Sequence, residues 1–173
     1  TIILALASMP LAFTYPLMKR FTYWPQLFLG ITFNYGIVLG WTTIKGQIDV
    51  IPLILYFGAI FWTLGYDTIY GYQDIKDDEI IGLKSTSIKF KGNAKLFLII
   101  CYLILISIFI IGGYLMEFNL FYFLILMIPT IQLFLYQIRY FDSNNPNTCL
   151  KIFKSNNYFG LIIFTNILIG KIF

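Results

Sequence analysis

Long apolar runs separated by short polar connections dominate the sequence. The runs cover residues 1–18, 27–44, 50–66, 96–116, 118–138 and 158–173, and Pro10 and Pro16 interrupt the first. Each is close to the length that a helix needs to cross about 30 Å of hydrocarbon at about 1.5 Å per residue. Helices are expected because a chain in lipid must satisfy its backbone polar groups internally. The pattern predicts an all-α, multi-pass transmembrane helical bundle with about six helices.

The composition supports lipid as the solvent of this chain. Charged residues make up 12% of the sequence and hydrophobic residues 59%, whereas a soluble domain has about 25% charged residues. The sequence contains no histidine, which excludes His-ligated metals and His-dependent nucleophilic catalysis within these residues. Cys101 and Cys149 have no metal-binding spacing and suggest no disulfide framework.

The positive charges follow the membrane topology. All lysines and arginines except Lys45 and Lys171 lie on alternate connections between the runs, and therefore on one side of the membrane. By the positive-inside rule this side is cytoplasmic, or the matrix side in a mitochondrion. The net charge of +4 forms no basic stripe with interleaved aromatics, so no nucleic-acid partner is expected.

Five of the eight acidic residues lie between residues 65 and 86. They are Asp67, Asp74, Asp77, Asp78 and Glu79. On one continuous helix, Asp67, Asp74 and Asp78 would fall within about 20° of a single stripe. Three such carboxylates repel one another unless a cation holds them, and Mg²⁺ prefers hard oxygen ligands. A magnesium site is one interpretation of the stripe, and a solvated charged loop is the other.

Three segments carry a resemblance to a known family. They are YPLMKRFTYWPQ (residues 15–26), YDTIYGYQDIKDDEIIGLKST (66–86) and FKSNNYFGLIIF (153–164). Together they resemble the UbiA superfamily of intramembrane prenyltransferases, and within it the 4-hydroxybenzoate polyprenyltransferases of ubiquinone synthesis. The likeness runs along essentially the whole chain with matching loop spacing.

The resemblance implies a fold, a cofactor and a site. Members of the family are bundles of about nine transmembrane helices around a cavity open to lipid, an architecture that leaves no backbone polar group unsatisfied in the bilayer. Two Asp-rich motifs bind Mg²⁺ and the diphosphate of a polyprenyl donor. The second motif corresponds to Asp67, Asp74 and Asp78, which are the expected catalytic and metal-binding residues. Lys19, Arg20, Lys84 and Tyr70 are the expected substrate-binding residues, near the diphosphate or the benzoate carboxylate.

One family motif is missing from the sequence. A motif of the form NDxxDxxxD is expected before the first residue, and the chain starts with Thr1 inside an apolar run, without features of a signal peptide. We therefore expect residues 1–173 to be one N-terminally truncated transmembrane prenyltransferase domain. It would hold the C-terminal six helices of an expected nine, and the activity of these residues alone is in doubt.

The expected reaction transfers a polyprenyl group to the ring carbon ortho to the hydroxyl of 4-hydroxybenzoate, with Mg²⁺ assisting loss of diphosphate. Its partners would be polyprenyl diphosphate, 4-hydroxybenzoate and the lipid bilayer, and association with other ubiquinone-synthesis proteins stays open. The membrane would be a bacterial or mitochondrial inner membrane, with the acidic motif on the cytoplasmic or matrix side. The alternatives are another aromatic acceptor, a transporter with an acidic ion site, and a non-catalytic remnant.

Overall fold

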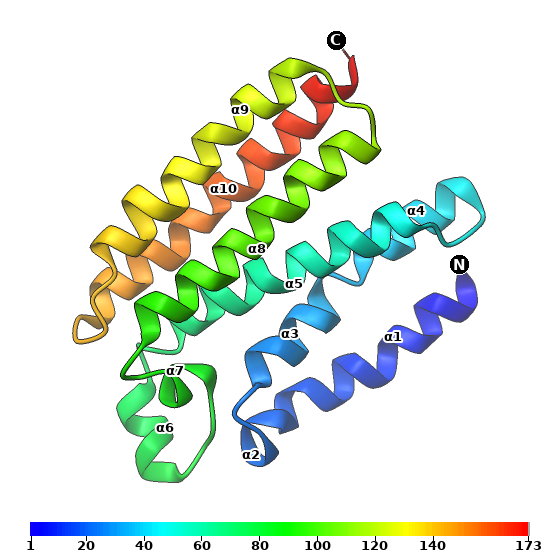
Figure 1. Cartoon of the computed structure of the whole chain (residues 1–173). Coiled ribbons are helices and arrows are strands. Elements are labelled where there is room, and N and C mark those ends of the chain that lie inside the picture. Colours follow the sequence, from blue (N-terminus) through cyan, green and yellow to red (C-terminus); the bar gives the residue numbers. More distant parts are fainter. Residues whose placement is uncertain (173) are drawn as a thin grey trace.

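The computed structural model describes residues 1–172, and the regular elements in this range are helical (Figure 1). The elements are α1 (Ile2–Thr14), the 3₁₀-helix η1 (Tyr15–Leu17), α2 (Met18–Phe21), α3 (Pro25–Phe33), α4 (Gly36–Lys45), α5 (Val50–Tyr70), α6 (Ile75–Ile81), α7 (Thr86–Lys89), α8 (Ala94–Leu115), α9 (Leu120–Ile131), the π-helix η2 (Gln132–Ile138) and α10 (Pro146–Ile172). The predicted all-α class is confirmed.

Five helical stretches are long and apolar enough to cross a membrane. They are Ile2–Phe21, Pro25–Lys45, Val50–Tyr70, Ala94–Leu115 and Leu120–Ile138, and they correspond to the first five predicted runs. The sixth run lies in α10, which has 27 residues. Lys151 and Lys154 make the first half of this helix polar. The last residue of the run, 173, lies outside the described residues.

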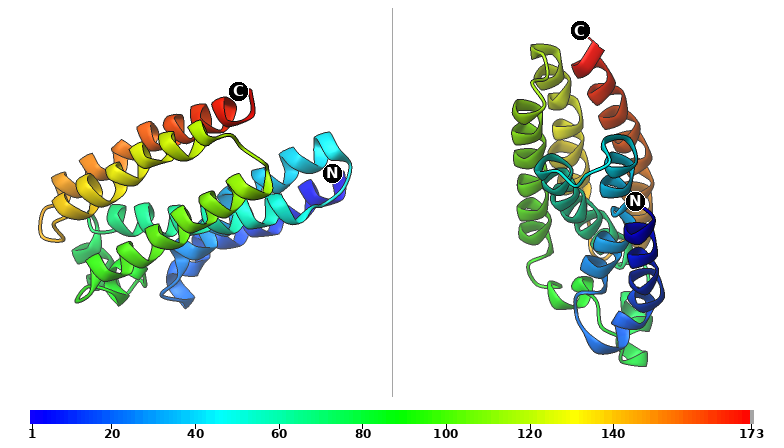
Figure 2. Two further views of the ribbon diagram at one scale, coloured as in Figure 1. Left: turned by 45° about the horizontal axis from the view of Figure 1, so that its top comes forward. Right: turned by 90° about the vertical axis from the view of Figure 1, so that its right-hand side faces the viewer.

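Helix α5 is the centre of the bundle. It packs along α8 and also contacts α3, α4 and α10, while α1 lies at the outer edge beside α3 (Figures 1 and 2). Two glycines allow α5 and α8 to approach closely. A Cβ added at Gly58 would lie 2.6 Å from Ile108 Cγ2, and one at Gly65 would lie 2.6 Å from Tyr102 Cε1. The largest buried cluster surrounds this contact and includes Leu105 and Phe159.

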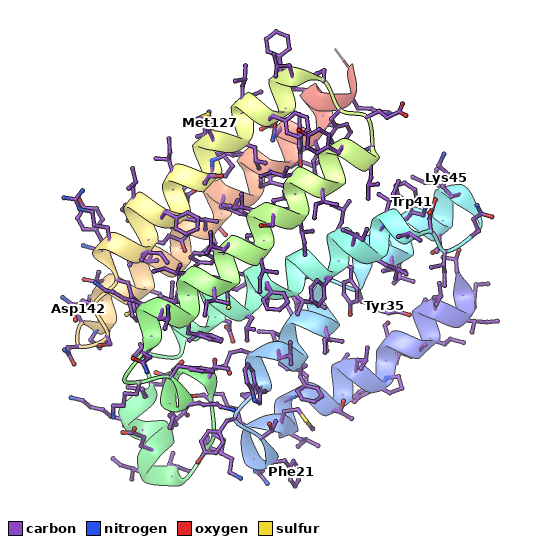
Figure 3. All side chains as sticks on the ribbon, in the orientation of Figure 1. Phe21, Tyr35, Trp41, Lys45, Met127 and Asp142 are labelled. Carbon is purple, nitrogen blue, oxygen red and sulfur yellow. The ribbon has the colours of Figure 1, made fainter. Side chains whose placement is uncertain are left out.

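The connections gather at two ends of the bundle. Phe21 and Asp142 lie toward one end, where α2, α6 and α7 also lie, and Lys45 lies at the other (Figure 3). Lys45, Glu117 and Lys171 line one shared hollow at that second end. We call the first end, with connections 18–24, 71–93 and 139–145, the charged end. The grouping of alternate connections at one end agrees with the charge pattern of the sequence.

One expected loop is mostly helical. The apolar runs 118–138 and 158–173 leave residues 139–157 as a long predicted connection, but α10 begins at Pro146, where the fixed φ of proline favours a helix start. The connection between α9 and α10 is correspondingly short. The other long connection, 67–95, contains the last turn of α5 and the two short helices α6 and α7.

Candidate functional site

The acidic motif is divided between two helices. Asp67 lies in the last turn of α5, which ends at Tyr70 and is followed by a turn that leads into α6 at Ile75. Asp74 is the N-cap residue of α6, and Asp78 lies inside this helix. The single continuous stripe expected for the three aspartates is therefore wrong.

The break after α5 lies where a later part of the same connection packs against the chain. Gly71 contacts the side chain of Ser87, so closely that a Cβ at residue 71 would overlap Ser87 Oγ. Ser87 in turn donates a hydrogen bond of 2.8 Å to the carbonyl oxygen of Thr68. The end of α5 is thus covered by the residues that begin α7, and a straight continuation of α5 is not available.

Lys19 contacts one of the three aspartates and shares a cavity with a second. Its Nζ is 3.2 Å from Asp78 Oδ2, and Lys19 and Asp67 line the same cavity. Asp78 is buried, Asp67 is half-buried and Asp74 is exposed. Among residues 1–172, no group of three or more acidic or cysteine side chains converges on a metal position. The structure therefore brings Asp67 and Asp78 to Lys19 and leaves Asp74 outside this contact.

The cavity is small and largely apolar. Its volume is about 250 Å³, which is below the range of about 300–1,000 Å³ for pockets that bind drug-sized ligands. The lining residues are Tyr15, Pro16, Lys19, Pro25, Gln26, Leu29 and Asp67. One ammonium, one carboxylate and one amide thus face an otherwise apolar space, which suits a small molecule with an anionic group.

Connection 18–24 is attached to connection 71–93. The backbone N–H of Lys84 donates to the carbonyl oxygen of Lys19 at 2.8 Å. The side-chain Nζ of Lys84 donates to the carbonyl oxygen of Phe21 at 3.3 Å and lies 5.6 Å from the ring centre of Tyr23. Lys84 is therefore held beside Lys19.

The other two expected substrate-binding residues lie elsewhere. Arg20 is exposed on α2 and has no carboxylate partner within the described part of the chain. Tyr70 packs on Phe153 of α10, with ring centres 4.5 Å apart. Neither residue lines the Lys19 cavity, so their expected roles stay predictions.

A buried polar cluster that the sequence reasoning missed fixes the wall of the cavity. Gln26 Oε1 accepts a hydrogen bond of 3.0 Å from the backbone N–H of Thr86. The hydroxyl groups of Thr86 and Thr68 are 2.6 Å apart. These bonds join α3, α5 and α7 at one point. The available signal was Gln26 itself, a polar residue at the start of an apolar run.

A second missed cluster lies among the membrane-spanning helices. Asn156 Oδ1 accepts from Trp62 Nε1 at 2.9 Å and from Gln137 Nε2 at 3.1 Å, while Tyr102 donates to Gln137 Oε1 at 2.6 Å. The cluster connects α5, α8, η2 and α10. Gln137 belongs to the π-helix, a local widening that is common at functional positions.

Comparison with known proteins decides the family. Residues 1–165 match the model of the UbiA prenyltransferase family. The chain belongs to this family. The UbiA assignment confirms the resemblance of the three sequence segments, and it fits a helical bundle whose charged residues gather at one end.

Curated relatives cover the whole chain. The UbiA chain is 44% identical over 176 residues to 4-hydroxybenzoate geranyltransferase 2 of Lithospermum erythrorhizon, covering 100% of the chain and 56% of that protein. It is 42% identical over 173 residues to the mitochondrial 4-hydroxybenzoate polyprenyltransferase of Homo sapiens, covering 99% of the chain and 46% of that protein. The chain thus spans about half the length of the curated relatives it matches.

Solved structures share the UbiA fold. A digeranylgeranylglyceryl phosphate synthase superposes with a TM-score of 0.76 at 17% identity, over 97% of this chain and 60% of that one. The apo structure of a UbiA homologue from Aeropyrum pernix K1 superposes with a TM-score of 0.74 at 22% identity, over 96% of this chain and 62% of that one. At these identities the likeness shows the fold alone.

Proposed function

We propose that this UbiA-family chain is part of a 4-hydroxybenzoate polyprenyltransferase, an enzyme of ubiquinone synthesis. The observation that carries the proposal is the identity of 42–44% over essentially the whole chain to relatives with 4-hydroxybenzoate prenyl-transfer names. The placement of Lys19 beside Asp67 and Asp78 supports it, because a donor diphosphate and a benzoate are both anionic. The names of the relatives include geranyl and polyprenyl donors, so the length of the donor stays open.

The donor set of the site suits magnesium in its chemistry. Asp67 and Asp78 offer hard carboxylate oxygens near Lys19, and Asp74 lies four residues before Asp78, at the spacing of neighbours on a helix. These aspartates would hold the ion, with coordination positions left for water and phosphate oxygens. Bound magnesium withdraws charge from the diphosphate and so assists its departure.

The residues of the chain then have separate tasks. Lys19 and Lys84 offset the charge of the diphosphate or of the benzoate carboxylate, as ammonium groups do at phosphates. The allylic C–O bond of the donor breaks and diphosphate leaves. The allylic carbon then bonds to the ring carbon ortho to the hydroxyl, and this ring carbon loses its proton. The apolar walls Pro16, Pro25 and Leu29 keep water from the reacting carbon.

The other hypotheses receive less support. A transporter would need its acidic groups near the middle of the membrane, whereas Asp67 is in the last turn of α5 and Asp78 is beyond its end. Another aromatic acceptor stays within the same proposal and is tested by competition. For the location, we propose an inner mitochondrial or bacterial membrane with the acidic motif on the matrix or cytoplasmic side.

The experiment compares aspartate variants of the full-length protein in isolated membranes. Asp67→Asn and Asp74→Asn should abolish formation of prenylated 4-hydroxybenzoate, because each removes an expected magnesium ligand. Asp77→Asn is the matched control, since Asp77 is exposed on α6 and should change the rate less than about twofold. Immunoblotting shows that each variant is inserted. Normal turnover by Asp67→Asn or Asp74→Asn would contradict the magnesium assignment. Prenylation of homogentisate in preference to 4-hydroxybenzoate would contradict the proposed acceptor.

A further inference from the structure

A second charged hollow lies at the charged end, away from the Lys19 cavity. It lies between the start of α8 and the connection after η2, and its volume is about 670 Å³. We call it the basic cleft and define it by Lys91, Lys95, Arg139 and Ser143. It shares no lining residue with the Lys19 cavity. The basic cleft is therefore not explained by the prenyl-transfer site.

The cleft carries a surplus of positive charge. Lys91 is paired with Glu79 at 2.8 Å, but within residues 1–172 no carboxylate forms an ion pair with Lys95 or Arg139. Asp142 also lines the cleft, and its Oδ1 accepts a hydrogen bond of 2.9 Å from the backbone N–H of Asn144. Two cations thus line the cleft beside one carboxylate, whose Oδ1 accepts a bond within a turn.

An adjoining cavity adds hydrogen-bond donors. Its volume is about 330 Å³, and it shares Lys91 and Ser143 with the cleft. Tyr72 and Gln73 line it, and the Tyr72 hydroxyl and Gln73 Nε2 are buried without a partner in the described structure. Burial raises the pKa of Tyr72 to about 12, so this hydroxyl keeps its proton at neutral pH. Donors without acceptors beside a basic cleft favour an anionic ligand.

A separate apolar groove lies farther along α8, where this helix packs against α9. It has a volume of about 320 Å³ and lies between Ile106 and Ile110 of α8 and Met127 of α9, a helix whose Met127 is on the outer side in Figure 3. From Leu96, at the cleft, to Ile106 is about 15 Å along α8, which is about the hydrocarbon thickness of one leaflet. Ile100 and Leu103, both exposed, lie on α8 between the basic cleft and the groove. The surface has a charged end and an apolar end at the spacing of a lipid headgroup and its acyl chain.

We propose that the seam between α8 and α9 binds one anionic glycerophospholipid of the leaflet at the charged end. The phosphate lies between Lys95 and Arg139, and one acyl chain reaches the groove at Ile106 and Met127. Basic pockets on this side of a membrane are suited to such headgroups. The site is independent of the prenyl-transfer proposal, because the two share no lining residue.

The test is retention of lipid by the purified full-length protein, measured by native mass spectrometry. The probes are phosphatidylglycerol and phosphatidylcholine with the same acyl chains. The protein should retain one phosphatidylglycerol in preference to phosphatidylcholine. Lys95→Gln/Arg139→Gln should weaken this retention at least about tenfold, because two cations near the phosphate are lost. Ile110→Trp, which fills the groove, should also reduce it.

A matched control separates a site from general attraction to the membrane. Lys151→Gln/Lys154→Gln removes two exposed cations of α10 at the same end and should leave retention unchanged. Equal losses in the two double variants would overturn the proposal, as would equal retention of phosphatidylcholine. Displacement of the lipid by glycerol phosphate at equal concentration would also overturn it, because a free phosphate would then suffice as the ligand.

Discussion

Lys19 is the residue on which the candidate site depends most. Its ammonium is paired with Asp78, and Lys19 and Asp67 line the same cavity, so one cation lies near two carboxylates that would otherwise repel. The sequence allowed Lys19, Lys84, Asp67 and Asp78 to be nominated, and the structure brings these four together. The sequence did not reveal that Lys19 itself would pair with Asp78, because this contact joins residues that are 59 positions apart.

Replacement of Lys19 tests this arrangement. Lys19→Gln in the full-length protein should lower kcat/KM for prenyl transfer at least about tenfold, because a cation beside the diphosphate or benzoate is lost. Lys19→Arg should retain more activity than Lys19→Gln, since it keeps the charge. Lys45→Gln, at the opposite end of the bundle, is the control. Equal kinetics for Lys19→Gln and the control would show that Lys19 does not act at the substrate.

At the scale of helices, the sequence predicted the spans well and the break in the acidic motif poorly. The spans follow from local apolar composition, which is a property of each segment alone. At the turn after α5, Gly71 packs against Ser87, which comes sixteen residues later in the same connection, and this contact is not a property of the local sequence. The cluster at Asn156 was missed for the same reason, because its members come from four elements.

The Asn156 cluster should stabilise the bundle. Asn156→Leu leaves Trp62 Nε1 without its acceptor and leaves Gln137 Nε2 only the longer bond of 3.4 Å to Ser155 Oγ. It should lower the free energy of unfolding by about 1–2 kcal/mol. Asn157→Leu is the matched control, because Asn157 is the exposed neighbour on the same helix. Thermal unfolding in detergent measures both. Equal melting temperatures for the two variants would mean that the bonds of Asn156 add no stability.

The whole molecule is a bundle with two chemically different ends, and its orientation can be measured. Asp77 is exposed at the charged end and Gln47 at the other. The cysteines Cys101 and Cys149 are buried, and burial raises the pKa of Cys149 to about 11. A thiol reacts as its thiolate, and at a pKa of about 11 the thiolate fraction at neutral pH is very small, so buried Cys149 should stay unlabelled.

A maleimide that does not cross membranes should therefore label only an introduced cysteine. In inside-out vesicles it should label Asp77→Cys and not Gln47→Cys, and in right-side-out vesicles the reverse, because the charged end is expected on the inner side. The unsubstituted protein is the control for the native cysteines. Labelling of both variants from the same side would contradict the bundle topology, and the opposite pattern would contradict the orientation.

The bond between the N–H of Lys84 and the carbonyl oxygen of Lys19 has a consequence for how this region tolerates change. It joins two connections through main-chain atoms, so most substitutions at either position leave it intact, and among the standard residues proline at position 84 is the one that removes the donor. Insertions or deletions between α6 and residue 84 would instead displace the donor from the acceptor. Apart from Lys19, Lys84 and the aspartates of the site, divergence should accordingly be freer in the side chains of these connections than in their lengths.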